Sequence, residues 1–331
     1  MSPAPLTTGI LGFGHHARTA LVPALQEAPA FRLHAIASRS TPSNGIGLAG
    51  NIEHVEDYER LIADPAVEVV IIATSNQHHA ALAAQALALG KHVLCEKPLA
   101  VSASDIAVLE QATESSSALL LEGMMYRFHS QHRLVRSLVA DNTIGPLRLF
   151  ESHCHYYLAD RENSRLRAGC AGGALNDVGC YPLDACAFVT GLSPRRLSGS
   201  LLVDRELGVD IAASFHIDLG PSAAAQIGAG CRLAPRANYY RLVGEKGTLT
   251  AEPAYKTPRN KKCRIRLDRE DSSTRWYEVP PENQTSNMLQ AFARWIRTGV
   301  AADAIPNDPL ENARRLIAAR AAAESAQVVS L

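Results

Sequence analysis

The residues best suited to chemistry stand in the stretch 171–184, which holds three glycines, two carboxylates and a phenol. Asp177 and Tyr181 are four positions apart and Asp184 lies seven after Asp177, so on a helix the three side chains share one face. Two acids and a phenol are costly to bury unless they line a site. The stretch therefore predicts either a proton-transfer site or a capped helix start with a buried, hydrogen-bonded tyrosine.

A glycine-rich turn near the start of the chain has the spacing of a phosphate-binding loop. An apolar strand is expected over 6–11, and an alanine-rich helix ends near Leu25. A tight turn, close backbone approach and a helix N-terminus suit a pyrophosphate. The flanking strand and helix favour a dinucleotide site over an ordinary strand-to-helix turn. The turn reads Gly12-Phe13-Gly14-His15-His16-Ala17.

The end of the second expected strand, 31–37, indicates which dinucleotide binds. Proteins that bind NAD place an acid near this strand end to hold the ribose 2′-hydroxyl. Here Ser38 and Arg39 stand instead. A hydroxyl and a guanidinium suit a 2′-phosphate, so NADP(H) is the predicted cofactor. The alternative is that Arg39 is only a solvated loop cation.

Strands and helices continue to alternate up to about residue 124. This alternation predicts a parallel, doubly wound sheet, in which ligands bind at the carboxyl ends of the strands. Glu96-Lys97-Pro98 follows one such strand, so Lys97 is expected at the ligand edge. The further strands are expected at 69–73, 92–95 and 118–121, and the helices at 58–62, 80–89 and from Ser102 or Ser104 to about 114.

The second half has a different pattern. A helix is expected at 131–140, a strand at 148–157 and a polar loop at 160–168. From 197 to 279, glycine-containing turns separate short segments in which apolar and polar residues alternate, and this pattern predicts an antiparallel sheet. Helices near 287–297 and 310–326 close the chain. The predicted architecture is α/β: a dinucleotide-binding domain at 1–124, and an α+β domain at 125–331 with an open, mostly antiparallel sheet for substrate binding and oligomerisation.

Composition narrows the class of protein. The 331 residues are 47% hydrophobic and carry no formal net charge, which argues against a nucleic-acid or anionic-membrane partner. No apolar run reaches the length of a membrane span, and the first residues lack the pattern of a secretory signal. Seven cysteines without a C-x-x-C pair fit reduced thiols. A cytoplasmic protein is expected.

A metal site is the competing interpretation of the histidines and cysteines. No pair among them has the spacing of a structural zinc knuckle, so scattered core cysteines and loop histidines are favoured and no metal is expected. The residues in question are His129, His132, His153, Cys154, His155, Cys170 and Cys180.

Taken together, the motifs resemble the Gfo/Idh/MocA oxidoreductases. The resemblance covers nearly the whole chain and is closest to the branch with tyrosine, here Tyr181, in place of a catalytic histidine. It departs from the family at Ser75, Ala171 and Asn176, where a proline, a glycine and an apolar residue are frequent. The motifs that carry it are Gly12-x-Gly14-x-x-Ala17, Glu96-Lys97-Pro98 and Gly172-Gly173-Ala174-Leu175-x-Asp177-x-Gly179-x-Tyr181-x-x-Asp184.

The resemblance implies a Rossmann domain followed by an α/β domain whose open sheet packs against a partner subunit. It implies Lys97 beside the nicotinamide, Tyr181 as the acid/base and Asp177 orienting the substrate, with these three as the catalytic set. The substrate-binding residues would be Arg165, Asp177, Tyr181 and Asp184. The cofactor-binding residues would be Gly12, Phe13, Gly14, His15, His16, Ser38, Arg39, Thr74, Asn76, His79, Glu96 and Lys97.

These expectations define an NADP(H)-dependent oxidoreductase that acts on a carbonyl or alcohol of a sugar or sugar derivative. Dihydrodiol or xylose dehydrogenase activity is the alternative within the class, and a non-catalytic NADP-binding sensor is the alternative outside it. Alternating apolar and polar residues over 211–218 leave one face of the sheet mixed, which suits a symmetric interface. A homodimer or homotetramer is therefore expected.

Overall fold

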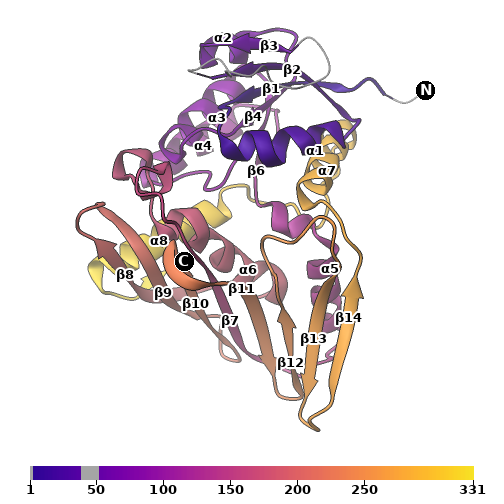
Figure 1. The fold of residues 1–331 in the computed structure, drawn as a ribbon, viewed down its shortest axis with the longest axis vertical. Helices are drawn as coiled ribbons and strands as arrows, with labels where there is room; N and C mark the ends of the chain where they lie inside the picture. The colour runs from indigo at the N-terminus through magenta and orange to yellow at the C-terminus, as the bar shows by residue number, and fades with distance from the viewer. Residues whose placement is uncertain (1–2, 39–51) are drawn as a thin grey trace. The chain divides into compact units, whose positions relative to one another are not determined.

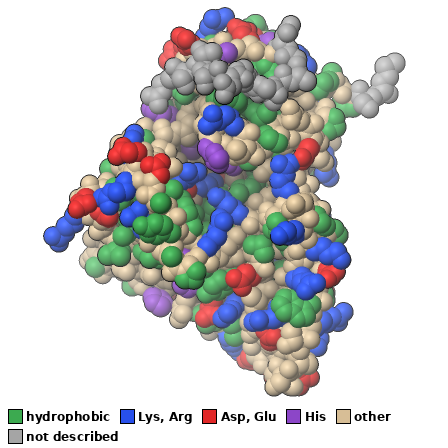
Figure 2. Space-filling view, in the orientation of Figure 1, with side chains coloured by type: hydrophobic (Ala, Val, Ile, Leu, Met, Phe, Trp, Pro, Cys, Tyr) green, Lys and Arg blue, Asp and Glu red, His purple; other side chains and the backbone are tan. Residues whose placement is uncertain are grey.

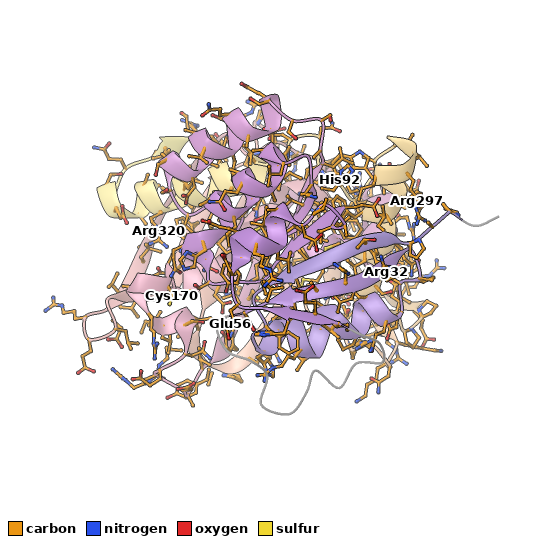
Figure 3. The ribbon with its side chains drawn as sticks, turned by 90° about the horizontal axis from the view of Figure 1, so that it is seen from above. Arg32, Glu56, His92, Cys170, Arg297 and Arg320 are labelled. Atoms are coloured by element: carbon orange, nitrogen blue, oxygen red, sulfur yellow. The ribbon has the colours of Figure 1, made fainter. Side chains whose placement is uncertain are left out.

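The structure is a computed structural model that describes residues 3–38 and 52–331. The chain packs into two compact units, Met1–Met125 with Thr285–Leu310, and Tyr126–Gln284 with Glu311–Leu331 (Figure 1). The later segment of the first unit is tied to its N-terminal part by Arg297, labelled in Figure 3. This guanidinium donates to the carbonyl oxygens of Ala4, at 2.8 Å, and Ala30, at 3.3 Å.

The first unit is built on a six-stranded sheet in the order β3-β2-β1-β4-β5-β6, and all its pairs are parallel. The central strands β1 and β4 are buried throughout, as their apolar sequences predict. The doubly wound fold is thus confirmed, and the short β3 is an addition to the expected strands. The strands are β1 (Leu6–Leu11), β2 (Phe31–Ala37), β3 (Glu53–Val55), β4 (Val69–Ile72), β5 (His92–Cys95) and β6 (Leu120–Glu122).

Helices cover this sheet. The first begins as a π-helical turn, Ala17–Leu21, and continues as α1 (Val22–Gln26). Of the two serines expected to cap α4 (Ala103–Glu114), Ser102 does so: it accepts from the Asp105 backbone N–H at 3.1 Å, and the Asp105 carboxylate accepts from the Ser102 N–H at 3.0 Å. The remaining helices are α2 (Tyr58–Ala63), α3 (His79–Ala88) and α7 (Gln284–Thr298).

The second unit contains a nine-stranded sheet in the order β14-β13-β12-β11-β7-β10-β9-β8-β15. Neighbouring strands are antiparallel except for β7 and β10, which pair in parallel. The expected mostly antiparallel sheet is therefore confirmed. The strands are β7 (Leu147–Tyr157), β8 (Arg196–Asp204), β9 (Val209–Asp218), β10 (Ala224–Gly230), β11 (Arg232–Gly244), β12 (Gly247–Ala251), β13 (Cys263–Arg269), β14 (Thr274–Val279) and β15 (Val329–Ser330).

Three helices, α5 (Ser130–Ala140), α6 (Cys180–Thr190) and α8 (Glu311–Ser325), lie against one face of this sheet (Figure 1). Strand β9 is therefore buried on one face only: Phe215 and Ile217 are buried, whereas Ser214 and His216 are exposed. The predicted two-faced strand is confirmed, and its polar residues lie on the face away from these helices.

Basic and acidic side chains are interspersed over the lower part of the face shown in Figure 2, in keeping with the formal net charge of zero. Within residues 3–38 and 52–331, no helix has both the length and the apolar character needed to cross a membrane.

Candidate active site

The turn after β1 has the backbone of a phosphate-binding loop. Gly12 has φ +90°, and a Cβ there would lie 2.6 Å from the Ala73 carbonyl oxygen, so only glycine fits without strain. A Cβ at Gly14 would meet no atom within 4 Å, so this backbone faces open space. A loop closed on the protein side and open at its second glycine fits a pyrophosphate at a helix N-terminus. The expected Phe13, His15 and His16 lie on the same turn.

A side-chain contact joins this turn to the end of β5. The His16 Nε2 lies 2.8 Å from the Glu96 Oε1, and the Glu96 side chain is only 12% exposed. Burial raises the pKa of the Glu96 carboxyl. His16 and Lys97 act in the opposite direction and outweigh burial, so the pKa of Glu96 is held below its ordinary value. The contact fixes the strand end that carries Lys97 to the glycine turn.

His79 has a different setting from the cofactor contact expected for it. It is 1% exposed, and its Nδ1 and Nε2 lie 2.8 Å and 3.2 Å from the carbonyl oxygens of Pro98 and Thr74. Burial lowers the pKa of this imidazole. His79 therefore ties the loop after β4 to the loop after β5. Asn76, also expected at the cofactor, begins a 3₁₀ turn that follows Ser75 in the first of these loops.

The strand end expected at the 2′-phosphate is partly described. The Ser38 hydroxyl lies 2.9 Å from the Nε2 of His54 on β3. Arg39 lies outside the described residues. Sequence reasoning missed His54 because β3 is only three residues long and carries no motif.

Gly173, which precedes α6, is required by a buried carboxylate. Gly173 has φ +109°, and a Cβ there would lie 2.3 Å from the Asp210 Oδ1. The other carboxylate oxygen of Asp210 accepts from the Leu175 backbone N–H at 2.6 Å. Asp210, on β9, thus holds the start of the helix that leads to Tyr181.

Asn176, one of the departures from the family pattern, belongs to the same anchor. Its Oδ1 and the Oδ1 of Asp210 both accept from Arg320 of α8, each at 3.2 Å, and Arg320 is labelled in Figure 3. The Asn176 side-chain amide donates to the Ala171 carbonyl oxygen at 3.0 Å. Ala171 adopts φ +51°, a left-handed conformation in which glycine is more comfortable. Nothing in the sequence pattern pointed to Asp210 or Arg320.

Asp177 lies in a π-helical turn, Leu175–Gly179, and not in a regular α-helix as expected. Its Oδ2 accepts from the Tyr156 hydroxyl at 2.5 Å, and its Oδ1 accepts from the Arg165 Nε at 3.1 Å. Burial opposes the charge of Arg165, but Asp177 outweighs it and raises the pKa of the guanidinium, with smaller contributions from Tyr156 and Tyr181. Asp177 thereby orients a cation whose side chain is 39% exposed. Single π-helical turns are frequent at functional sites.

Tyr181, on the first turn of α6, is 1% exposed and packed among aromatic rings. Its ring stacks on Tyr255, with centroids 5.4 Å apart and an interplanar angle of 19°. Tyr126 packs edge-on at 6.1 Å and 85°. These two rings fix the plane of the phenol.

Asp184 has different partners from Asp177. Its side chain is fully buried, and its Oδ2 accepts from the Tyr126 hydroxyl at 2.5 Å. Arg127 forms a bidentate ion pair with it: the Arg127 Nε donates to Oδ2 at 2.7 Å, and the Arg127 Nη2 donates to Oδ1. The expectation that the two acids and the phenol serve one face of one regular helix is therefore wrong, because the π-helical turn and separate cationic partners divide the acids between two clusters.

The histidines that could be drawn as metal ligands have other partners in the structure. His129 caps α5 by accepting from the Gln131 N–H at 3.2 Å, and His132 bonds to Tyr240 at 2.8 Å. In the part of the chain that the structure describes, no three histidine, cysteine or acidic side chains form a group that could hold a metal ion.

Within the first unit, the structure thus places the glycine turn, Ser38, Glu96 and Lys97 at carboxyl ends of parallel strands. Within the second, it gathers Arg165, Asp177 and Tyr181 at the start of α6. The first group fits a dinucleotide, and the second offers a phenol, a cation and a carboxylate for a polar substrate. This combination defines the class of an oxidoreductase with a Rossmann domain.

Comparison with known proteins agrees with this class. A family model described as "Oxidoreductase family, NAD-binding Rossmann fold" matches residues 6–124, and the model of the GFO/IDH/MocA C-terminal domain matches residues 132–250. The chain belongs to the Gfo/Idh/MocA oxidoreductase family.

Among its relatives is the dTDP-3,4-didehydro-2,6-dideoxy-alpha-D-glucose 3-reductase of Streptomyces violaceoruber, which is 32% identical over 88% of this chain and 85% of the relative. The D-xylose 1-dehydrogenase (NADP(+)) 2 of Haloferax volcanii is 30% identical over 88% of this chain and 89% of the relative. The crystal structure of a 3-ketoreductase from Actinomadura kijaniata with NADP and TDP-benzene is similar at a TM-score of 0.88 and 26% identity, covering 97% of both chains.

Proposed function

We propose that this protein is an NADP(H)-dependent oxidoreductase that transfers a hydride between the nicotinamide and a carbonyl or alcohol carbon of a sugar or sugar derivative. The observation that carries the proposal is the phenol of Tyr181, held by two aromatic rings in the same unit as the Asp177–Arg165 pair. A tyrosine held in this way suits proton transfer to and from a substrate oxygen.

Tyr181 is the acid/base in this proposal. In the reductive direction its phenol gives a proton to the substrate oxygen, and in the oxidative direction its phenolate removes one. A free tyrosine has a pKa near 10, so the oxidative role needs a cation close by. Lys97 is proposed as a further catalytic residue, because it follows β5 at the strand end where the nicotinamide is expected.

The cofactor, when bound, supplies or accepts the hydride. The chain's part is to hold it. Gly12 and Gly14 would receive the pyrophosphate, and Ser38 and Arg39 the 2′-phosphate. His16 and Glu96 would fix the turn to the Lys97 segment.

The substrate is proposed to be a sugar or sugar nucleotide with adjacent hydroxyl groups. Arg165, oriented by Asp177 and exposed on its outer side, can donate hydrogen bonds to such hydroxyls. We propose a positioning role for Asp184, in place of a substrate contact, because its side chain is fully buried and paired.

The test is a panel assay of NADPH consumption with keto-sugar nucleotides and free keto-sugars, and of NADP⁺ reduction with D-xylose and a trans-dihydrodiol. Turnover of a sugar substrate supports the proposal, and its class separates a ketoreductase from a sugar dehydrogenase. Turnover confined to the dihydrodiol would assign the alternative activity. NADPH binding without turnover of any substrate would favour the sensor and contradict the proposal.

We also propose a cytoplasmic homodimer or homotetramer. The face of the β9 region with Ser214 and His216 is exposed in the single chain and lies away from the helices, so a second copy can cover it. Light scattering at micromolar concentration should give at least twice the mass of one chain. A monomer mass would contradict this assembly.

A further inference from the structure

Arg127 and Asp184 form a deeply buried ion pair near Tyr181. The Arg127 side chain is 7% exposed and the Asp184 side chain is fully buried. Asp184 lies three residues after Tyr181 on α6, and side chains at that spacing are neighbours on a helix. Removal of one member of such a pair leaves the other charge buried and uncompensated.

Tyr126 contacts both Asp184 and Tyr181. The Tyr126 hydroxyl donates to Asp184, while the Tyr126 ring packs edge-on against Tyr181. Burial raises the pKa of the Tyr126 phenol, and Asp184 raises it further. Burial likewise raises the pKa of Tyr255, which stacks on Tyr181, and Asp184 adds to this shift. The carboxylate thus opposes the ionisation of the phenols around Tyr181.

Arg127 counters this effect. Its pairing with the carboxylate is bidentate, which fixes a positive charge against both oxygens of Asp184. The guanidinium also lies 4.7 Å from the centroid of the Phe188 ring, which holds it in place from the other side. The Arg127 guanidinium is therefore a fixed counter-charge to Asp184, and it differs in this from a mobile surface cation.

We propose that Arg127 is a positioning residue that acts through Tyr181: it neutralises Asp184, so that loss of the Tyr181 proton does not place two uncompensated negative charges one helical turn apart. This inference rests on the proposed acid/base role of Tyr181. Among the described residues of the second unit, the other charged and titratable groups around Tyr181 are Tyr126, Tyr255, Arg165 and Asp177.

The experiment is a pH titration of the phenolate absorbance of the NADP⁺ complex, with the titration of Tyr181→Phe subtracted. Arg127→Met should raise the apparent pKa of Tyr181 by about 1–2 units, because Asp184 is left uncompensated. Asp184→Asn should lower it, because Arg127 is then left uncompensated. The double variant should return close to the parent value. A pair that serves only to stabilise the fold gives no shifts of opposite sign.

Arg127→Lys is the conservative control: it keeps the charge, so the pKa of Tyr181 should stay near the parent value even where the melting temperature falls. If Arg127→Met does not fold, Asp184→Asn and Arg127→Lys still carry the test. Shifts of the same sign in both single variants, or none, would overturn the inference while leaving the proposed function intact. A parent protein in which Tyr181 does not ionise over the tested range would overturn both.

Discussion

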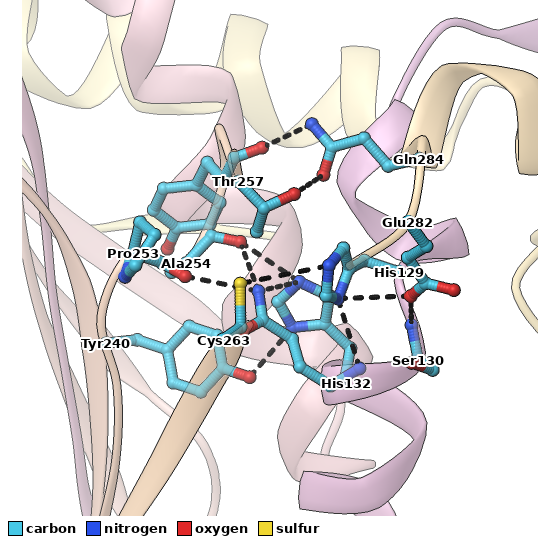
Figure 4. A network of polar contacts seen from close by, with 12 residues as sticks. His129, Ser130, His132, Tyr240, Pro253, Ala254, Thr257, Cys263, Glu282 and Gln284 are labelled. Carbon is cyan, nitrogen blue, oxygen red and sulfur yellow. Dashed lines mark hydrogen bonds and ion pairs between the residues drawn. The ribbon is translucent and has the colours of Figure 1, made fainter. Parts of the chain in front are cut away.

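Tyr181 and Tyr255 lie nearly face to face, with ring centroids 5.4 Å apart. Tyr255 is itself fixed: its hydroxyl lies 2.5 Å from the Ser152 Oγ, its N–H donates to Asn238 at 2.7 Å, and its carbonyl oxygen accepts from Gln284 at 2.9 Å. Figure 4 shows polar contacts of the neighbouring residues, among them the Thr257 hydroxyl, which lies 3.0 Å from the Gln284 Oε1. Stacking on this fixed ring holds the plane of the Tyr181 phenol, which suits the proton transfer proposed for it.

Tyr181→Phe keeps the ring stacking and removes the proton. We expect kcat to fall by about 10²–10⁴-fold while the Kd for NADPH is unchanged, because general acid–base catalysis contributes this much. The measurement is single-turnover kinetics with a substrate found in the panel. Tyr277→Phe, on the edge strand β14, is the matched control and should retain full turnover. A near-normal kcat for Tyr181→Phe, when chemistry limits the rate, would remove Tyr181 from the acid/base role.

Arg39→Ala should weaken NADPH binding by about 1.5–3 kcal/mol, because a charge-assisted hydrogen bond to the 2′-phosphate is lost. The affinity for NADH should barely change, since NADH has no 2′-phosphate. Fluorescence titration with both cofactors measures the difference. Arg60→Ala removes an exposed cation of α2 that pairs with Glu53, and it should leave both affinities unchanged. Equal affinity of the unaltered protein for the two cofactors would contradict the prediction.

The two small residues before α6 should respond in opposite ways to substitution. Gly173→Ala should destabilise the protein by at least about 2 kcal/mol, because the new Cβ meets Asp210 at a positive φ. Ala171→Gly should be neutral or stabilising by up to about 1 kcal/mol, because it relieves a left-handed alanine at the cost of a more flexible unfolded chain. Urea unfolding measures both. Equal losses of stability in the two variants would show that the backbone conformations are not as described.

Buried histidines should make the protein sensitive to acid. Burial lowers the pKa of His132 to about 3, below its value in the unfolded chain, so unfolding takes up a proton below about pH 6.5. This contribution to stability is therefore present above pH 6.5 and falls as the pH drops toward 3, by up to about 1.4 kcal/mol per pH unit. The slope of the unfolding free energy against pH gives the number of protons taken up on unfolding. Urea unfolding at several pH values between 3 and 6.5 should show about one proton fewer for His132→Gln.

Tyr240→Phe is the matched control for that experiment. It removes the hydroxyl that bonds to His132, but it removes no group that titrates in acid, because burial raises the pKa of the Tyr240 phenol. The slope should then stay as in the parent protein while the midpoint of unfolding shifts. An unchanged slope in His132→Gln would show that this imidazole does not stay neutral in the fold.

The sequence alone determined the class of fold, because apolar periodicity and glycine spacing are local. The run Val69–Ile72 specifies a buried parallel strand, and the turn from Gly12 to Ala17 has the glycine spacing expected of a phosphate-binding loop, without reference to distant residues. The sequence also limited the cap of α4 to Ser102 or Ser104, and the structure shows that Ser102 takes this place. These features follow from backbone geometry over one or two turns of chain.

Only the tertiary structure decided how the carboxylates are used. Asp177 and Asp184 look alike in sequence, but one orients Arg165 and the other pairs with Arg127, which comes from a segment more than fifty residues away. Likewise Asp210 holds the start of α6 from the middle of β9. A buried charge takes the partner that packing brings within hydrogen-bond distance, and that partner is set by the whole fold and not by spacing along the chain.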